Sequence, residues 1–377
     1  MKKGGISFIF LLIAAVFYSC KDDYKPPAIN GNPGYLVVDG FLNNTSDTTF
    51  IRLSRTAKLQ PDLSIPNTAE KNAQLSIGDE EGNSLYFFQP YTIDGVYMIP
   101  GINLDANKKY VLNINTADGK KYTSDKIPVK QTPPIDSANW IRNNDGVTIY
   151  ANTHDPLNNT KYYRWEYTDT YEYTSQYYSS LLYRNDSLFD RSAADQIFYC
   201  WRTRNSTSLM LTSSAQLSQD VIYNFPVKQI PLNSIEISIK YSLLLKEYAV
   251  TKEAFEYFQN LKKNTEEIGS IFDVQPSQLP GNIHCITNPD EIVLGFMTAT
   301  NLQTKRIFIR NEDVMPWPYH PLCGDTLKTI PPDSVRFYLT SGYVPVFSLL
   351  GGAIKISSEL CVDCRVQNGI TKKPDFW

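Results

Sequence analysis

Cys20 stands where its thiol could be acylated. It follows a basic start at residues 2–3 and an apolar run over residues 6–18, with the small Ser19 directly before it. This order is typical of a bacterial lipoprotein signal peptide, which is cut before the cysteine so that the thiol can carry diacylglycerol. The apolar run, about 13 residues, is too short to span the roughly 30 Å of hydrocarbon in a membrane. The pattern predicts a signal peptide over residues 1–19, and the position of Ser19 favours this over an ordinary secretory signal with an incidental cysteine.

The residues after Cys20 predict a tether. Lys21, Asp22 and Asp23 resemble the lysine-plus-acidic signal that directs Bacteroidota lipoproteins to the cell surface, although they also suit the charged start of a solvated linker. Residues 20–34 are rich in proline, glycine and asparagine and have little to bury, so we expect a flexible segment. The predicted location is the outer membrane, with a lipid anchor and a surface-exposed body.

Five cysteines remain for other chemistry, and disulfides are the default in an exported protein. They are Cys200, Cys285, Cys323, Cys361 and Cys364. Because five is odd, at least one thiol stays unpaired within the chain, and we expect two intrachain disulfides. A bond from Cys323 to either Cys361 or Cys364 would fix the C-terminal tail. Closing such a loop of about 40 residues adds roughly 3–4 kcal/mol in the chain-entropy model.

A zinc site is the alternative use of these thiols. His320 and Cys323 form an H-x2-C pair, and Cys361 and Cys364 form a C-x2-C pair, which together give four zinc ligands on paper. The long spacing between the pairs and the oxidising compartment favour disulfides. We therefore expect no metal and no cofactor.

Catalytic motifs are scarce. The chain has three histidines, and none lies in an H-E-x-x-H motif; no G-x-S-x-G elbow or phosphate-binding glycine loop occurs. A glycosidase is an alternative, because the two catalytic carboxylates of such an enzyme need not be close in sequence. An enzyme is the less favoured class.

Composition indicates a β-rich extracytoplasmic protein. The 377 residues carry a net charge of −3, and only 20% are charged, so no basic surface for nucleic acid is implied. Aromatic residues make up 13% of the chain, with 25 tyrosines, as is common in strands.

Short strands separated by turn residues at roughly ten-residue spacing predict an N-terminal β-sandwich, immunoglobulin- or transthyretin-like, over residues 35–130. Residues 131–377 then form a second β-sandwich domain with a C-terminal tail tied by a disulfide. The fold class is thus mainly β. One amphipathic helix, expected near residues 252–268 with Thr251 as its N-cap, interrupts the second domain.

One strand carries aromatic side chains at every second position over much of its length. Tyr163, Trp165, Tyr167, Tyr171 and Tyr173 share one face of a strand. They could stack a sugar ring or contact a partner as an exposed binding face. The alternative, that they cover the core, is favoured because large aromatic side chains are mostly buried.

Several short segments serve as landmarks of one family: residues 163–166, 200–201, 240–244, 251–258, 264–273, 275–277, 281–285, 305–309, 364–365 and 373–377. Through them the chain resembles a Bacteroidota outer-membrane lipoprotein family, domain of unknown function 4249. The resemblance covers essentially the whole mature chain. Members of this family are often encoded beside TonB-dependent receptors, and no catalytic residues are established for them.

From this resemblance we expect a non-catalytic binding or accessory role beside a TonB-dependent channel in nutrient uptake, with a glycan or peptide as a possible ligand. The alternative is a structural or adhesive surface lipoprotein without a transport partner, and a glycan-acting hydrolase comes third.

Overall fold

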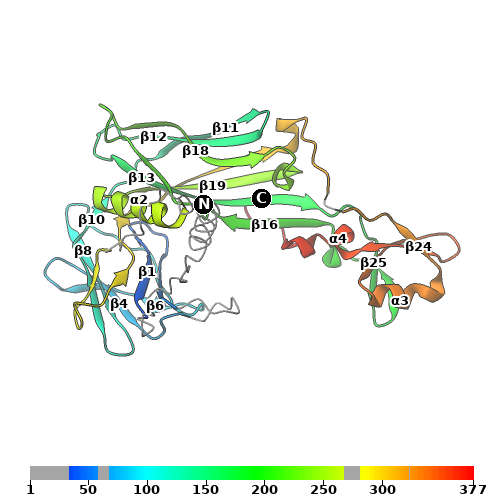
Figure 1. Ribbon diagram of the computed structural model, residues 1–377, viewed down its shortest axis with the longest axis horizontal. Helices are drawn as coiled ribbons and strands as arrows, with labels where there is room; N and C mark the ends of the chain where they lie inside the picture. The colour runs from blue at the N-terminus through cyan, green and yellow to red at the C-terminus, as the bar shows by residue number, and fades with distance from the viewer. Residues whose placement is uncertain (1–33, 58–67, 267–280, 322) are drawn as a thin grey trace, which may run out of the picture.

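The computed structural model describes residues 34–57, 68–266, 281–321 and 323–377, and these form a mainly β protein with few helices (Figure 1). The predicted signal peptide, Cys20, the Lys21–Asp22–Asp23 signal and nearly all of the tether lie outside the described residues. No helix in the described ranges is long and apolar enough to cross a membrane.

Two sheets enclose the first core. In the described residues the smaller sheet has the order β21 (Val293–Leu294), β1 (Leu36–Gly40), β3 (Thr49–Arg55), β7 (Val96–Ile99), β6 (Gln89–Pro90). The larger has the order β2 (Leu42–Asn43), β22 (Ala299–Thr300), β10 (Ile127–Lys130), β8 (Lys109–Asn115), β4 (Gln74–Gly78), β5 (Ser84–Phe87), with β9 (Lys121–Ser124) pairing β8 and β20 (Ile283–Cys285) pairing β9. Alternating residues such as Leu36, Ile51, Leu75 and Leu112 are fully or almost fully buried between them.

Three short strands in the later part of the chain return to this first core. β21 pairs β1 in parallel, β22 pairs both β2 and β10, and β20 pairs β9. The sequence assigned residues 283–300 to the second region because they follow it in the chain. In the structure they complete the sheets of residues 36–130, since a two- or three-residue strand is stabilised only by the strands it joins.

Two further sheets enclose the second core. One has the order β11 (Ile135–Asn143), β12 (Gly146–His154), β18 (Val221–Pro231). The other has the order β16 (Tyr199–Asn205), β13 (Tyr162–Thr174), β19 (Lys240–Ala249), β23 (Gln303–Arg310), with β17 (Met210–Ser213) also paired to β13.

The aromatic face of β13 lies in this second core. Tyr163 and Trp165 are 0% exposed, Tyr171 is 2% and Tyr173 is 1%, while Tyr167 is partly buried against the same cluster. The prediction of an exposed aromatic binding face is therefore wrong, and the core interpretation holds. The physical reason is that the opposing sheet covers this face, where large apolar rings gain most from leaving water.

Helix α2 (Lys252–Glu266) lies where the two cores meet. Thr251 caps it, because its Oγ1 accepts a hydrogen bond from the Ala254 N–H at 3.2 Å. The predicted helix is confirmed up to Glu266, and its last two predicted residues lie outside the described ranges. Its buried Ala254 and Phe258 pack in a cluster that includes Tyr248 from β19 and Phe296 from the segment after β21. The helix is thus held by elements of both cores.

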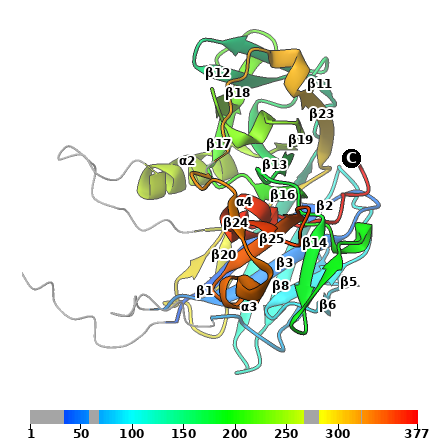
Figure 2. The ribbon, with the colours of Figure 1, turned by 90° about the vertical axis from the view of Figure 1, so that its right-hand side faces the viewer.

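An arm projects from the far ends of β13 and β16 (Figure 1) and faces the viewer in Figure 2. We define it by its elements: β14 (Leu181–Arg184), β15 (Ser187–Asp190), β24 (Lys328–Ile330), α3 (Val335–Thr340), β25 (Tyr343–Ser348), β26 (Ile354–Ser358) and α4 (Glu359–Val362). Short 3-10 helices lie at Ala193–Asp195, Ile235–Ile237, Asn311–Val314, Pro332–Ser334 and Cys364–Gln367. Two small apolar clusters stabilise the arm, one around Ile356 and one around Val362.

Candidate binding groove

A groove of about 620 Å³ lies between the outer face of the β21–β1–β3 sheet and helix α2. Its volume falls in the range of small-molecule sites, and such sites favour the junctions between domains or packed units. The first core lines it through β1, β3 and β21, and the sheets of the second core contribute Arg164 of β13, so neither core forms the groove alone.

Strand alternation builds the floor of this groove. In β1, Leu36 and Val38 point into the first core, and Val37 and Asp39 therefore point outward. In β3 the same alternation turns Arg52 outward. The pairing of the two strands sets Asp39 opposite Arg52.

An aromatic wall faces the floor. Tyr257, Phe258 and Leu261 come from α2, and Phe296 packs on the two rings, at 5.2 Å from Tyr257 and 6.5 Å from Phe258 between ring centroids. These contacts give one side of the groove a largely apolar surface.

Gly295 brings Phe296 to this wall. Its φ of +130° is a conformation that residues with side chains rarely adopt, and a Cβ there would lie 2.1 Å from the Val38 carbonyl oxygen. Only glycine lets the chain after β21 pass so close to β1.

Arg164 of β13 also lines the groove, and its charge is already paired. The guanidinium carbon lies 4.8 Å from the Phe258 ring centroid and 5.6 Å from that of Tyr248. Its Nη2 forms an ion pair with Glu166, whose other carboxylate oxygen accepts a hydrogen bond from the Tyr248 hydroxyl at 2.8 Å. Arg164 therefore connects β13 to α2 through its contact with the Phe258 ring, while its charge is paired within the second core.

Asp39 and Arg52 differ from Arg164 in having no matched charge. Both are exposed, and neither forms a hydrogen bond or ion pair with any residue that the structure describes. Opposite charges on directly facing strand positions usually attract each other. Here a cation and an anion stand side by side on the floor, each available to a ligand.

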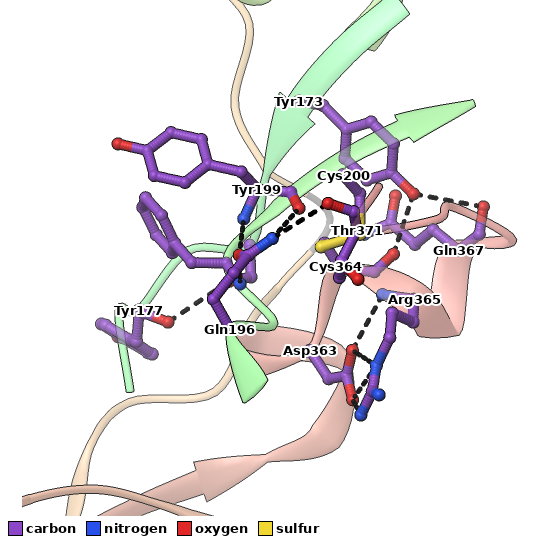
Figure 3. Close-up of a disulfide and its surroundings, with 12 residues drawn as sticks. Tyr173, Tyr177, Gln196, Tyr199, Cys200, Asp363, Cys364, Arg365, Gln367 and Thr371 are labelled. Atoms are coloured by element: carbon purple, nitrogen blue, oxygen red, sulfur yellow. Dashed lines mark hydrogen bonds and ion pairs between the residues drawn. A yellow bond between two sulfur atoms is a disulfide. The ribbon is translucent and has the colours of Figure 1, made fainter. Parts of the chain in front are cut away.

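The predicted site cysteines form two disulfides, as expected from the sequence. Cys323 bonds to Cys361, one of the two partners that the sequence left open, and Cys200 bonds to Cys364 (Figure 3). Cys285 is unpaired and buried. The alternative zinc set of His320, Cys323, Cys361 and Cys364 is not formed, because its three sulfurs are in disulfide bonds.

Hydrogen bonds fix the chain around the Cys200–Cys364 bond. The Tyr173 hydroxyl donates to the Cys364 carbonyl oxygen at 2.8 Å, and Gln196 Nε2 donates to the Thr371 carbonyl oxygen at 3.4 Å (Figure 3). Further along, the Ile370 N–H donates to the Trp201 carbonyl oxygen at 2.9 Å. The C-terminal tail is thus fastened to β16 by a covalent bond and by backbone pairing.

Two of the three histidines in the sequence each contact a single carboxylate at an exposed position. His154 Nδ1 lies 2.8 Å from Asp136 Oδ2, and this contact raises the pKa of His154. His284 Nε2 lies 2.9 Å from Asp125 Oδ1. Across the described residues, no group of three or more histidine, cysteine or acidic side chains could hold a metal ion.

The buried acidic groups lie away from the groove. Asp169 forms an ion pair with Arg204 at 2.7 Å, and Arg204 also pairs with Glu236 at 2.6 Å inside the second core. Burial raises the pKa of Glu247 to about 9. Among the described lining residues of the groove, Asp39 is the single carboxylate, so they bring no pair of the kind that glycoside hydrolysis uses.

The groove itself has no signature in any short stretch of the sequence. In the sequence, Asp39 and Arg52 are polar positions of two separate strands. Only the pairing register of β1 and β3 sets them opposite each other. The one local signal was the alternation that turns both side chains outward.

Comparison with known families gives one match. The family described as "Domain of unknown function (DUF4249)" matches residues 21–306, which is more than half of the chain. The expectation that the resemblance covers the whole mature chain is therefore too broad. Its landmarks at residues 364–365 and 373–377 lie outside the matched stretch, as does most of the arm.

Among solved structures, two of alpha-2-macroglobulin from Escherichia coli are similar to this chain, one activated by trypsin and one by porcine elastase. They match 59% and 58% of the chain at 12% identity, with TM-scores of 0.20 and 0.18. The chain spans only 15% and 18% of their length, and a likeness this weak supports no statement about fold or function. No curated protein matches the chain.

Proposed function

The chain belongs to the DUF4249 family, whose description states no activity, and we propose its function from its residues together with what the family resemblance implies. The protein is an outer-membrane lipoprotein, anchored through Cys20 and exposed at the cell surface. It has a non-catalytic binding or accessory role beside a TonB-dependent receptor in nutrient uptake. In this proposal residues 36–130 with 283–300, and the remaining β structure, act as two β-sandwich domains.

The groove between the β21–β1–β3 sheet and α2 is the observation that carries the binding role. It combines an apolar wall with two charges on its floor that no described residue neutralises. A pocket of this composition suits the reversible capture of a small molecule. The absence of a carboxylate pair among its described lining residues supports binding over hydrolysis.

The lipoprotein part of the proposal is supported by the order of basic start, apolar run and Ser19–Cys20, and it is tested by fractionation of cells. Cys20→Ala should move the protein from the membrane fraction to the soluble fraction, because a bilayer no longer holds its acyl chains. Unchanged membrane retention of the variant would contradict the lipid anchor.

The transport role is tested by mild crosslinking of intact cells, affinity capture of the protein and mass identification of what comes with it. Stoichiometric recovery of a TonB-dependent β-barrel is the expected result. Recovery of the lipoprotein alone would contradict the transport role.

A second candidate is a structural or adhesive surface lipoprotein without a transport partner. The burial of the β13 aromatic face favours it, since an exposed face would have served a binding module. The arm favours it as well, because Phe337 and Leu350 expose 69% and 104% of their reference surface there. Loss of cell-to-surface attachment on deleting the gene, with nutrient uptake unchanged, would select this candidate.

A further inference from the structure

We propose that the groove binds a zwitterion with an apolar body, the chemical class of the aliphatic and aromatic α-amino acids. This inference rests on the proposed binding role and specifies its ligand. Asp39 would bind the ammonium group, Arg52 the carboxylate, and the apolar wall the side chain.

The two charged side chains on the floor determine which charges a ligand should carry. Cross-strand neighbours have Cβ atoms about 5 Å apart, and the pairing of β1 and β3 sets Asp39 opposite Arg52. The ammonium and carboxylate of an α-amino acid are attached to one carbon atom, so they can meet two adjacent side chains of opposite charge together. A ligand with one charge would leave either Asp39 or Arg52 unmatched, and a covered, unmatched charge is costly.

The apolar residues of the groove can bind an apolar ligand side chain. Val37 on the floor and Leu294 beside it are paired across β1 and β21. Tyr257, Leu261 and Phe296 face them from the wall. A ligand side chain placed between these two surfaces leaves water on both sides, which is the main source of affinity for apolar groups.

The backbone excludes one alternative ligand, an extended peptide that would add a strand to the sheet. β1 is paired on both edges, by β21 and β3, and β3 is paired by β1 and β7. β1 and β3 therefore offer no free strand edge, and the edge strand of this sheet, β21, has only two residues, too few to hold an added strand. Recognition on the floor is left to side chains.

Arg164 is also excluded as the anion-binding group. Its guanidinium is already paired with Glu166 and lies against the rings of Phe258 and Tyr248. Arg52, which has no described partner, is the cation that a ligand carboxylate can reach.

The test is equilibrium dialysis of the full-length protein in lipid nanodiscs against three labelled probes that share one phenyl group. L-phenylalanine carries both charges, 2-phenylethylamine only the positive one and 3-phenylpropionate only the negative one. We expect L-phenylalanine to bind about tenfold or more tightly than either analogue, because each charged hydrogen bond is worth roughly a factor of ten. Equal binding of all three, or no binding of L-phenylalanine at millimolar concentration, would overturn the proposal.

Two variants assign the charges. Arg52→Gln should reduce the binding of L-phenylalanine and 3-phenylpropionate but leave that of 2-phenylethylamine unchanged. Asp39→Asn should reduce the binding of L-phenylalanine and 2-phenylethylamine but spare 3-phenylpropionate. Both residues are exposed strand positions, so thermal melting curves should match the parent.

Matched controls lie on the arm. Arg184→Gln and Asp190→Asn make the same charge changes at exposed positions of β14 and β15 that have no described partner. They should leave the binding of all three probes unchanged. An equal loss of binding in the controls and the groove variants would show that net charge, not the floor pair, governs binding.

The outcomes separate this inference from the proposed function. Membrane anchoring through Cys20 and capture of a TonB-dependent barrel do not depend on the ligand of the groove. If L-phenylalanine does not bind but both cell experiments succeed, only the zwitterionic ligand is ruled out. If the cell experiments fail but L-phenylalanine binds, the ligand of the groove is established and the transport role is not.

Discussion

At the scale of the residue, burial decides what each ionisable group can do. Glu247 lies on β19 opposite Trp165 of β13 and is 0% exposed, and burial raises the pKa of its carboxyl group to about 9. It is therefore uncharged near neutral pH. Asp39 and Arg52, by contrast, lie exposed on the surface of the first core and have no partner among the described residues.

The raised pKa of Glu247 predicts a pH dependence of stability. The unfolded carboxyl group has its ordinary value of 4.5, so the contribution of Glu247 to stability is fully present below that pH. It is lost as the pH rises towards about 9, because only the unfolded chain releases the proton in this interval. Each unit of pKa difference corresponds to about 1.4 kcal/mol, so the free energy of unfolding should fall by several kcal/mol.

Urea denaturation between about pH 5 and pH 9 measures this slope. Glu247→Gln should flatten it, since glutamine does not titrate, whereas Glu81→Gln at an exposed turn should leave it as in the parent. A parent protein whose stability does not change over this range would contradict the assignment.

At the scale of the element, close approach of backbones positions the groove. The segment after β21 passes directly over β1 at Gly295, and Phe296 then joins the rings of α2. Helix α2 is in turn held from the second core by Arg164. The groove thus depends on contacts between elements that are far apart in the chain.

Gly295→Ala should lower the free energy of unfolding by several kcal/mol, because the added methyl group collides with the Val38 carbonyl oxygen. Gly82→Ala is the matched control: its φ is also positive, at +91°, but a Cβ there has no atom within 4 Å. The control should cost only about 1 kcal/mol, the strain of the conformation alone. Chemical denaturation of both variants checks this, and equal losses would mean that the approach to β1 is not tight.

At the scale of the whole molecule, the two disulfides stabilise different parts of the C-terminal region. Cys323–Cys361 closes a segment of the arm with a sequence separation of 38, and Cys200–Cys364 joins the tail to β16 across a separation of 164. In the chain-entropy model such loops add about 4 and about 5 kcal/mol. The first bond acts within the arm and the second between the tail and the second core.

Limited trypsin digestion should distinguish these roles. Cys323→Ser with Cys361→Ser should expose Lys328 and Arg336 of the arm to rapid cleavage, while the two cores stay resistant, because opening is local. Cys200→Ser with Cys364→Ser should instead speed cleavage at Lys372 near the tail. Mass mapping under non-reducing conditions checks both, and identical patterns in the two double variants would contradict the separate roles.

The sequence by itself determined the features that depend on neighbouring residues. Strand alternation identified the shared face of Tyr163 and Trp165, and Thr251 marked the start of α2, because periodicity and capping act within a few residues. With Cys20 assigned to a lipid anchor, the other five cysteines predicted at least one unpaired thiol, and Cys285 is unpaired in the structure. The mainly β class followed from the same local patterns.

Only the tertiary structure decided which distant segments of the chain come into contact. It buried the β13 aromatic face, paired Cys200 with Cys364 across 164 residues, and returned β20–β22 to the first core. It also set Asp39 beside Arg52, which a shift of one residue in register would prevent. Such outcomes depend on the free energy of packing distant segments together, and no short stretch of sequence contains that information.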